Sequence, residues 1–261
     1  MMILIVFLVC FLASVVGAVC GIGGGVIIKP TLDALGILDV STISFLSGCT
    51  VLSMTSYSVL SSRKNSASSF DPHIGLPLSI GAAAGGIIGK QLFEIVKSLS
   101  NDPNRVGAVQ AAFLLIVTLG TLLYTIFKDK IPTHQVRNRM FCLLIGLGLG
   151  IMSAFLGIGG GPINLVLLFW FFSMDTKCAA ENSLYMIFFS QAASLVVSIL
   201  SGTVPQFPLS MLLLMVCGGI FGGICGRNLN KKLNNQTVDK LFIALMILMI
   251  FINLYNIFLL I

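Results

Sequence analysis

The sequence predicts an all-α polytopic membrane protein of two homologous halves, each containing a helix broken at glycines. Three observations predict this fold. Hydrophobic residues make up 57% of the chain and charged residues only 9%, whereas a soluble domain carries roughly 25% charged residues. The run Gly-Ile-Gly-Gly-Gly at 21–25 recurs letter for letter at 157–161. A second pair of runs, at 85–90 and 222–227, follows in the same order, and such an internal duplication is typical of secondary transporters.

The first half begins with an apolar run at 2–19, which we interpret as a retained helix. It lacks the basic start and the cleavage site of a signal peptide. After the glycines comes a short run at 26–38. Longer runs of about the length needed to cross a bilayer then predict helices at 41–62, 74–96 and 106–127.

The second half repeats this order after the most charged connection of the chain. We divide the protein into a first transmembrane repeat (1–128), a charged cytoplasmic linker (129–139) and a second transmembrane repeat (140–261). The predicted helices of the second repeat lie at 140–156, 162–172, 178–200, 207–225 and 238–261.

The positions of Lys and Arg predict how the halves are oriented, because short cytoplasmic loops carry an excess of both. If each glycine break lay within one continuous span, most cations outside the linker would lie on the outer side, against this rule. If the chain turns back at each break, the linker, the 63–64 pair and the 227–240 group all lie inside. Only Lys29, Lys90, Lys97 and Arg105 are then left outside. The second arrangement gives each half an odd number of crossings, so the charge pattern favours inverted repeats.

The duplicated glycine runs predict a binding site near the middle of the membrane. The apolar run after each is about a dozen residues long, which fits a half-helix starting at the glycines better than a full span. The first N–H groups of a helix have no partners within it, and its dipole makes that end positive. Two such ends would bind an anion; the alternative is that the glycines only allow close helix packing. The glycines of this predicted site are Gly23, Gly24, Gly25, Gly159, Gly160 and Gly161.

Polar residues inside the predicted spans are further candidates. Asn164, Ser47, Thr50, Asn182 and Gln191 are the predicted substrate ligands. The hydroxyl groups among them have an alternative role, which is to bond to carbonyl groups of their own helix. Glu181 is a carboxylate at the edge of a span and therefore a candidate for proton coupling; equally, it could lie at the membrane surface beside Lys177.

At these glycine runs the chain resembles the sulfite exporter TauE/SafE family, also called the TSUP permeases. Members are small membrane proteins with two homologous halves, each with a Gly-x-Gly-Gly-Gly segment after its first helix and a proline shortly beyond, here Pro30 and Pro162. The resemblance implies movement of sulfite, sulfoacetate or other sulfonates across the cytoplasmic membrane. Many members carry a Gly-Thr-Ser-like signature in the next span, where this chain has residues 181–183, Glu-Asn-Ser.

We therefore expect a multi-pass secondary transporter of small anions in the cytoplasmic membrane, with export as the direction that the family implies. The expected partners are a small anionic substrate and the lipid bilayer, without nucleic acid, and a homo-oligomer is left open. We expect no cofactor and no metal, because the cysteines form no C-x-x-C or Cys/His cluster. An enzyme is disfavoured because the spans contain no histidine. The alternative is a non-transporting membrane partner or assembly protein.

Overall fold

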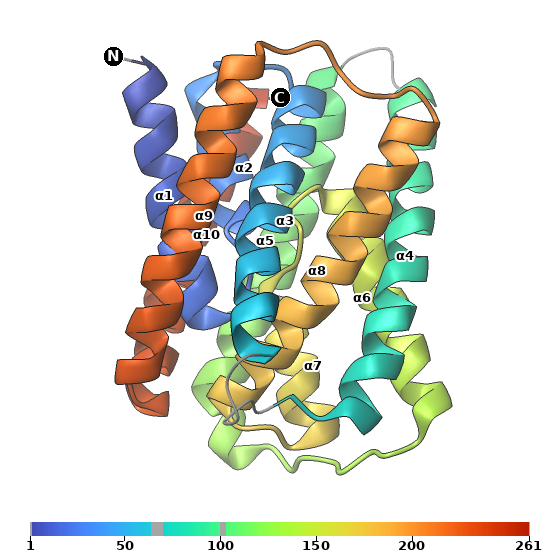
Figure 1. The fold of residues 1–261 in the computed structure, drawn as a ribbon, viewed down its shortest axis with the longest axis vertical. Coiled ribbons are helices and arrows are strands. Elements are labelled where there is room, and N and C mark those ends of the chain that lie inside the picture. Colours follow the sequence, from blue (N-terminus) through green and yellow to red (C-terminus); the bar gives the residue numbers. More distant parts are fainter. Residues whose placement is uncertain (1, 64–69, 100–102, 261) are drawn as a thin grey trace.

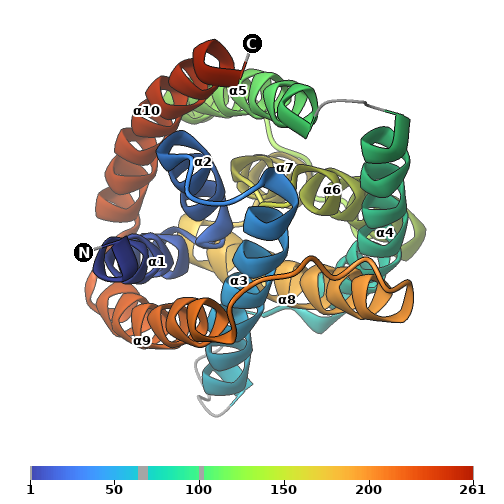
Figure 2. The same ribbon diagram turned by 90° about the horizontal axis from the view of Figure 1, so that it is seen from above.

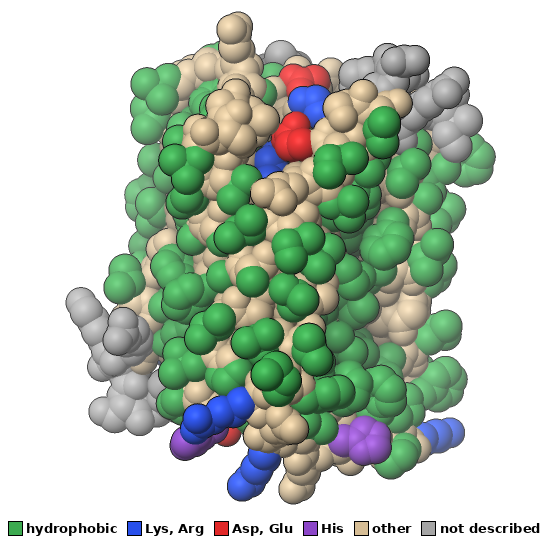
Figure 3. All heavy atoms as spheres, turned by 90° about the vertical axis from the view of Figure 1, so that its right-hand side faces the viewer, with side chains coloured by type: hydrophobic (Ala, Val, Ile, Leu, Met, Phe, Trp, Pro, Cys, Tyr) green, Lys and Arg blue, Asp and Glu red, His purple; other side chains and the backbone are tan. Residues whose placement is uncertain are grey.

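The computed structural model describes residues 2–63, 70–99 and 103–260 of the protein. Within these ranges all regular structure is helical, with ten α-helices and one short 3-10 helix. Eight of the α-helices are long and apolar enough to cross a membrane. On the face shown in Figure 3, charged side chains gather at the two ends and hydrophobic ones cover the surface between them. The prediction of a polytopic all-α membrane protein is confirmed.

Both halves contain the same succession of one long helix, one short helix and three long helices. The first half consists of α1 (Met2–Cys20), α2 (Gly25–Leu35), α3 (Val40–Arg63), α4 (Pro72–Leu99) and α5 (Pro103–Phe127). The second half follows the short η1 (Lys128–Lys130) and consists of α6 (Arg139–Leu156), α7 (Pro162–Phe172), α8 (Thr176–Leu200), α9 (Leu209–Lys232) and α10 (Asn235–Leu260).

Most helix ends differ from the predicted ones by one to seven residues, and two of the differences matter most. Helix α2 ends at Leu35 rather than at 38, because Gly36 takes a left-handed conformation (φ 60°) and its N–H bonds to the carbonyl of Asp33. Helix α9 continues to Lys232 rather than ending at 225, so Arg227 is a helix residue. Helix α7 has the predicted bounds.

The two short helices lie inside the molecule. Seen from above, α2 and α7 are surrounded by the longer helices (Figure 2). In the side view, α2 lies in the upper half and α7 in the lower half, and α3 and α8 pass beside them over the full height (Figure 1). Following the colours of Figure 1, α3 descends from the upper end while α8 rises from the lower end.

Contacts at the lower end of Figure 1 join segments from both halves. Lys128, after α5, forms an ion pair with Asp239 at the start of α10. The N–H of His134 in the connecting segment donates to the carbonyl of Trp170, near the end of α7. The start of α6 meets the start of α4, where Arg139 contacts His73.

Two helix pairs that cross between the halves pack through glycines. A β-carbon at Gly222 or Gly226 of α9 would lie 2.5 or 2.3 Å from a carbonyl oxygen of α1. Likewise, a β-carbon at Gly85 or Gly89 of α4 would lie 2.1 or 2.3 Å from a carbonyl oxygen of α6. These glycines let the backbones of the paired helices touch, as small residues commonly do in membranes. Each half thus packs its first helix on the fourth helix of the other half.

Candidate functional site

The two glycine runs meet each other in the middle of the molecule. A β-carbon at Gly23 would lie 3.3 Å from the carbonyl oxygen of Gly159, and one at Gly25 only 2.0 Å from that of Ile158. A β-carbon at Gly160 would lie 3.1 Å from the carbonyl oxygen of Ile22. The backbones of the two segments are therefore in direct contact, which we call the glycine contact (residues 21–25 and 157–161).

Several glycines of this contact have backbone conformations that other residues rarely adopt. Gly21 and Gly23 have φ values of 75° and 76°, and Gly157 and Gly159 have values of 66° and 69°. A side chain at these positions would add about 1–2 kcal/mol of strain per residue, apart from any collision. The repeated sequence therefore gives a repeated turn.

Each short helix starts at this contact without a side-chain cap. The residues before the first turns of α2 and α7 are Gly24 and Gly161, and neither helix start has a side-chain hydrogen bond. The third N–H of each helix, that of Ile27 or Asn164, donates to the carbonyl of Gly24 or Gly161. The N–H groups before it have no side-chain acceptor, and both positive helix ends point to the same region.

The helices that follow them start quite differently. Asp39 accepts a hydrogen bond from the N–H of Thr42 in α3, and Asp175 accepts one from that of Cys178 in α8. Burial raises the pKa of the Asp39 carboxyl, but the bonds from the Thr42 hydroxyl and N–H outweigh it, and the pKa lies below its ordinary value. These two aspartates, which follow the two glycine runs at the same distance in the sequence, are therefore helix caps.

Two apolar side chains close the glycine contact from the sides. Val51 of α3 lies against Gly159, where a β-carbon would be 2.7 Å from its side chain. Ile187 of α8 lies against Gly160 in the same way, at 2.4 Å. Both side chains are fully buried, and they correspond to each other when the two glycine runs are aligned. The centre is thus closed by one residue from each half, a pair that the sequence analysis missed although its repeat spacing could have revealed it.

Asn164 and Gln191 lie nearest to the contact among the predicted polar residues. Asn164 is buried on α7, and its amide nitrogen lies 3.4 Å from the hydroxyl of Ser183. It shares a small buried space beside Ile187 with Ser153 and Ser190, whose hydroxyls have no hydrogen-bond partner among the described residues.

Gln191 touches the second glycine run itself. A β-carbon at Gly159 would lie 3.2 Å from its amide carbon, and one at Gly48 would lie 2.9 Å from its amide oxygen. Its side chain is buried on α8. Gln191 therefore stands between the glycine contact and α3.

Other predicted residues lie away from the glycine contact. The Thr50 hydroxyl bonds to the carbonyl of Leu46 in its own helix, and the Asn182 amide donates to the carbonyl of Cys178. Ser47 is fully buried, and its hydroxyl has no partner among the described residues. Glu181 lies near the start of α8, where it accepts a hydrogen bond from Ser62 of α3.

Two cations lie inside the helix bundle, which corrects the expectation that they lie on the outer side. Lys29, expected on the outer side, is 3% exposed on α2. Lys90 lies on α4 with its side chain 12% exposed, 2.8 Å from the carboxylate of Glu94. Hydropathy averaged over a run missed both, because one charge changes the average little.

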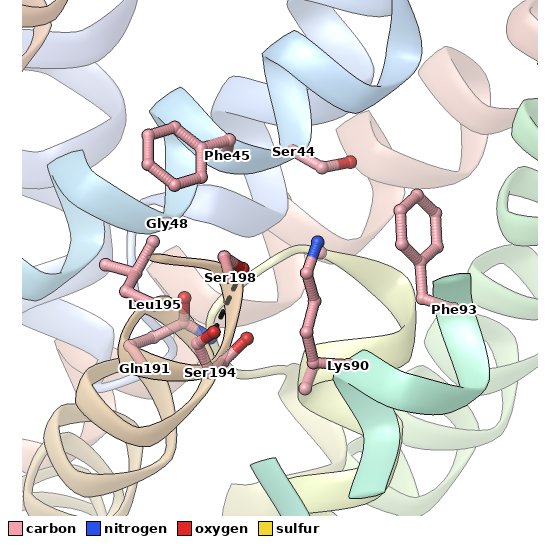
Figure 4. Close-up of a pocket in the computed structure, with 11 residues that line it drawn as sticks. Ser44, Phe45, Gly48, Lys90, Phe93, Gln191, Ser194, Leu195 and Ser198 are labelled. Carbon is pink, nitrogen blue, oxygen red and sulfur yellow. Dashed lines mark hydrogen bonds between the residues drawn. The ribbon is translucent and has the colours of Figure 1, made fainter. Parts of the chain in front are cut away.

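Lys90 lines a polar cavity of about 20 Å³ between α3, α4 and α8. Figure 4 shows it between Phe93 and three α8 side chains, which are those of Gln191, Ser194 and Ser198. A cavity of this size holds a water molecule but no sulfonate. The structure therefore has a closed centre with a small polar space on one side of it.

Arg227 is the counterpart of Lys90 in the second duplicated run. It lies on α9, and its guanidinium donates to the carbonyl of Ser58 on α3, at 2.9 Å. Its Nε has no partner, and no ion pair of Arg227 is found, within the ranges that the structure describes. In those ranges no three His, Cys, Asp or Glu side chains come together as a metal site would require.

Comparison with known proteins gives consistent results over most of the chain. A family model described as "Sulfite exporter TauE/SafE" matches residues 6–252. The chain is 25% identical over 260 residues to the probable membrane transporter protein YunE of Bacillus subtilis, an alignment that covers 91% of this chain and 92% of that protein. A 108-residue stretch, 40% of this chain, is 30% identical to 17% of the probable membrane transporter protein MamO of Paramagnetospirillum magneticum. No solved structure matches.

Proposed function

The chain belongs to the sulfite exporter TauE/SafE family and is a multi-pass membrane transporter, and from this premise we propose that it is a secondary transporter of small anions. The substrates we propose are sulfite or organosulfonates, the direction is export, and the location is the cytoplasmic membrane. The observation that carries this proposal is the meeting of two uncapped, glycine-rich helix starts in the middle of the protein.

The proposed anion site consists of the glycines at 23–25 and 159–161 with Asn164 and Gln191. The free N–H groups of the two helix starts supply donors, and the two dipoles supply positive potential. The two amide side chains add donors close by. Val51 and Ile187 have to move apart before an anion can enter, because they fill the space beside the glycines.

We propose that the two halves are inverted repeats that open this site alternately to each side. The opposite courses of α3 and α8 in Figure 1 support this, as do the positions of α2 above and α7 below the glycine contact. In this scheme Lys90 and Arg227 attract the anion on the upper and lower sides, respectively. Ser47, Thr50 and Asn182 are ligands for the state in which α3 and α8 have moved apart.

The lower end of Figure 1 is the cytoplasmic end in this proposal. It contains the connecting segment between the halves and the ends of α5 and α9. Basic residues are concentrated there: Lys128, Lys130, Arg137, Arg139, Lys177, Lys231, Lys232 and Lys240. The positive-inside rule places such an end in the cytoplasm.

Flux measurements in liposomes test the proposal. We would measure sulfite and methanesulfonate flux for the wild type, for Gln191→Glu and for Gln135→Glu. The first variant puts a negative charge beside Gly159 without changing side-chain shape, and we expect flux to fall at least about tenfold, the equivalent of 1.4 kcal/mol. The second puts the same charge on the exposed connecting segment and should leave flux unchanged.

Each result has a definite meaning. Equal flux in the wild type and Gln191→Glu would show that the anion does not bind at the glycine contact. Absence of flux for every anion tested, in a folded protein, would overturn the substrate proposal and favour a non-transporting role in an assembly.

A further inference from the structure

A buried pair of opposite charges lies on the first short helix, about one turn beyond the glycine contact. The ammonium of Lys29 donates to the side-chain oxygen of Gln110 on α5 at 2.6 Å. It lies 3.8 Å from a carboxylate oxygen of Asp33, whose side chain is 9% exposed. Burying two charges is unfavourable unless their remaining hydrogen bonds are made.

Those bonds are incomplete on the acceptor side. Lys29 and Asp33 share a cavity of about 10 Å³ with Asn253 and Asn256 of α10, which are 0% and 1% exposed. One oxygen of Asp33 and the side-chain oxygens of both asparagines have no partner among the described residues. Three buried acceptors around one cavity lack a donor, and a proton on Asp33 would provide a donor for one of the asparagine oxygens.

We propose that Asp33 is the site of a proton that moves together with the anion, an inference that rests on the proposed transport function. A protonated Asp33 becomes a donor for a neighbouring oxygen. A metal cation fits less well, because the Lys29 ammonium already lines the same cavity and would repel it. The described side chains facing the cavity from α5, α10 and the second glycine run include no other titratable group.

The position of Lys29 explains how proton and anion would be coupled. While Asp33 is charged, it offsets the charge of Lys29; a proton on Asp33 leaves the positive charge of Lys29 uncompensated near the glycine contact. Anion binding is then favoured, and because binding linkage is reciprocal, the anion favours protonation to the same extent.

Gln110 connects this pair to the second half. While its oxygen accepts from Lys29, its nitrogen donates to the carbonyl of Phe155 at 2.5 Å, two residues before the second glycine run. Asn256 donates to the carbonyl of Pro30 on α2 at 2.9 Å. Lys29, the ion-pair partner of Asp33, is therefore joined through Gln110 to the chain just before the second glycine run, while Asn256 binds the helix that follows the first run.

The experiment uses methanesulfonate, a strong-acid anion whose own charge is constant over the pH range. Proteoliposomes with a pH-sensitive dye inside report proton movement alongside anion flux for the wild type, Asp33→Asn and Glu181→Gln. In the wild type we expect protons to accompany the anion and flux to fall about tenfold per pH unit above the titration of the carboxyl. Asp33→Asn should retain anion exchange but lose proton movement and most of the pH dependence.

Two results with the variants would overturn the proposal. One is proton movement in Asp33→Asn equal to that of the wild type, and the other is loss of proton movement in Glu181→Gln alone. Stimulation by sodium at constant pH would replace the proton with a metal ion and would also overturn it. If Asp33→Asn does not fold, Lys29→Met/Asp33→Asn removes both charges and undergoes the same measurements.

A measurement that requires no transport distinguishes a failure of this proposal from a failure of the proposed transport function. In purified protein, infrared spectroscopy should detect a protonated buried carboxyl group at low pH in the wild type and not in Asp33→Asn. If the wild type moves no anion but shows this signal, the transport function fails and the protonation site stands. If the signal is missing from the wild type or unchanged in Asp33→Asn, Asp33 is not the site.

Discussion

The two short helices have the same architecture and different chemistry. Both α2 and α7 contain eleven residues, begin at an uncapped glycine and end at a left-handed residue, Gly36 or Ser173. When the helices are aligned from their first residues, Lys29 and Asp33 of α2 correspond to Val166 and Trp170 of α7. The backbone of the short helix is thus duplicated in the two halves, whereas the buried charges occur only in the first.

The first prediction tests whether the two ends of the glycine contact are equally crowded. Gly25 and Gly161 are the last glycines of the two runs. A β-carbon at Gly25 would lie 2.0 Å from a backbone oxygen, whereas one at Gly161 has its nearest neighbour at 3.5 Å. We expect Gly25→Ala to abolish transport and to lower the yield of folded protein severely, while Gly161→Ala remains close to wild type in liposome flux and thermal stability.

Similar effects of the two substitutions would show that Gly25 and Gly161 are equally crowded in the working protein, unlike in this structure. Loss of flux in Gly161→Ala with unchanged stability would show instead that the added methyl group obstructs the anion, because alanine keeps the backbone N–H.

The second prediction concerns the buried charge. Lys29→Met leaves Asp33 buried without its counter-charge, which we expect to destabilise the protein by about 3–5 kcal/mol. Val166→Met, at the matching position of α7, exchanges one half-buried apolar residue for another and should change stability by less than about 1.5 kcal/mol. The measurement is reversible unfolding in mixed micelles, monitored by the fluorescence of Trp170.

Lys29→Met/Asp33→Asn provides the control, because it removes both charges and should recover most of the lost stability. Failure of the double variant to recover would mean that Lys29 stabilises α2 by packing rather than by its charge.

The third prediction compares the cations of the two duplicated runs. Glu94 offsets the charge of Lys90, while no carboxylate within the described ranges pairs with Arg227. We therefore expect Arg227→Gln to weaken anion affinity about five- to tenfold, near 1 kcal/mol, and Lys90→Gln to weaken it less. The dependence of flux on anion concentration gives the affinity of each variant. A larger effect of Lys90→Gln would show that Lys90, rather than Arg227, contributes more to anion affinity.

The smallest effects are expected at the helix caps. Asp39→Ala and Asp175→Ala should each reduce stability by about 1 kcal/mol without altering anion affinity. Because the folded-state pKa of Asp39 is lowered, its contribution is fully present above the unfolded pKa of about 3.9 and is lost as the pH falls through the lower folded value. The stability difference between the wild type and Asp39→Ala should therefore vanish in acid; a constant difference would contradict the cap assignment.

Much of the fold could be predicted because it depends on repeated, local signals. The glycine runs mark both breaks, and long apolar stretches give the eight long helices. The bounds of α7 were predicted fully because Pro162 starts that helix and a polar residue follows Phe172.

The chemistry around the contact was predicted less well, because it depends on which residues meet in space. Nothing in the sequence neighbourhood of Lys29 indicates that Gln110, some eighty residues later, accepts its hydrogen bond. In the sequence, Val51 and Ile187 look like ordinary apolar helix residues. Only the structure shows that they lie against the two glycine segments. The signal that a single sequence offers is positional. Val51 and Ile187 are equally spaced from the two glycine runs, and Lys90 and Arg227 are the last residues of the runs at 85–90 and 222–227.

The crossed helix pairs have a consequence for how the protein is made. Because α1 packs on α9 and α4 packs on α6, the partner of the first helix is synthesised near the end of translation. Gly85 and Gly89 of α4 likewise have no packing partner until α6 has been synthesised. The nascent first half therefore enters the bilayer with two of its closest interfaces empty. Neither half, expressed alone, should accumulate in the membrane, whereas the two expressed together as separate chains should rescue each other.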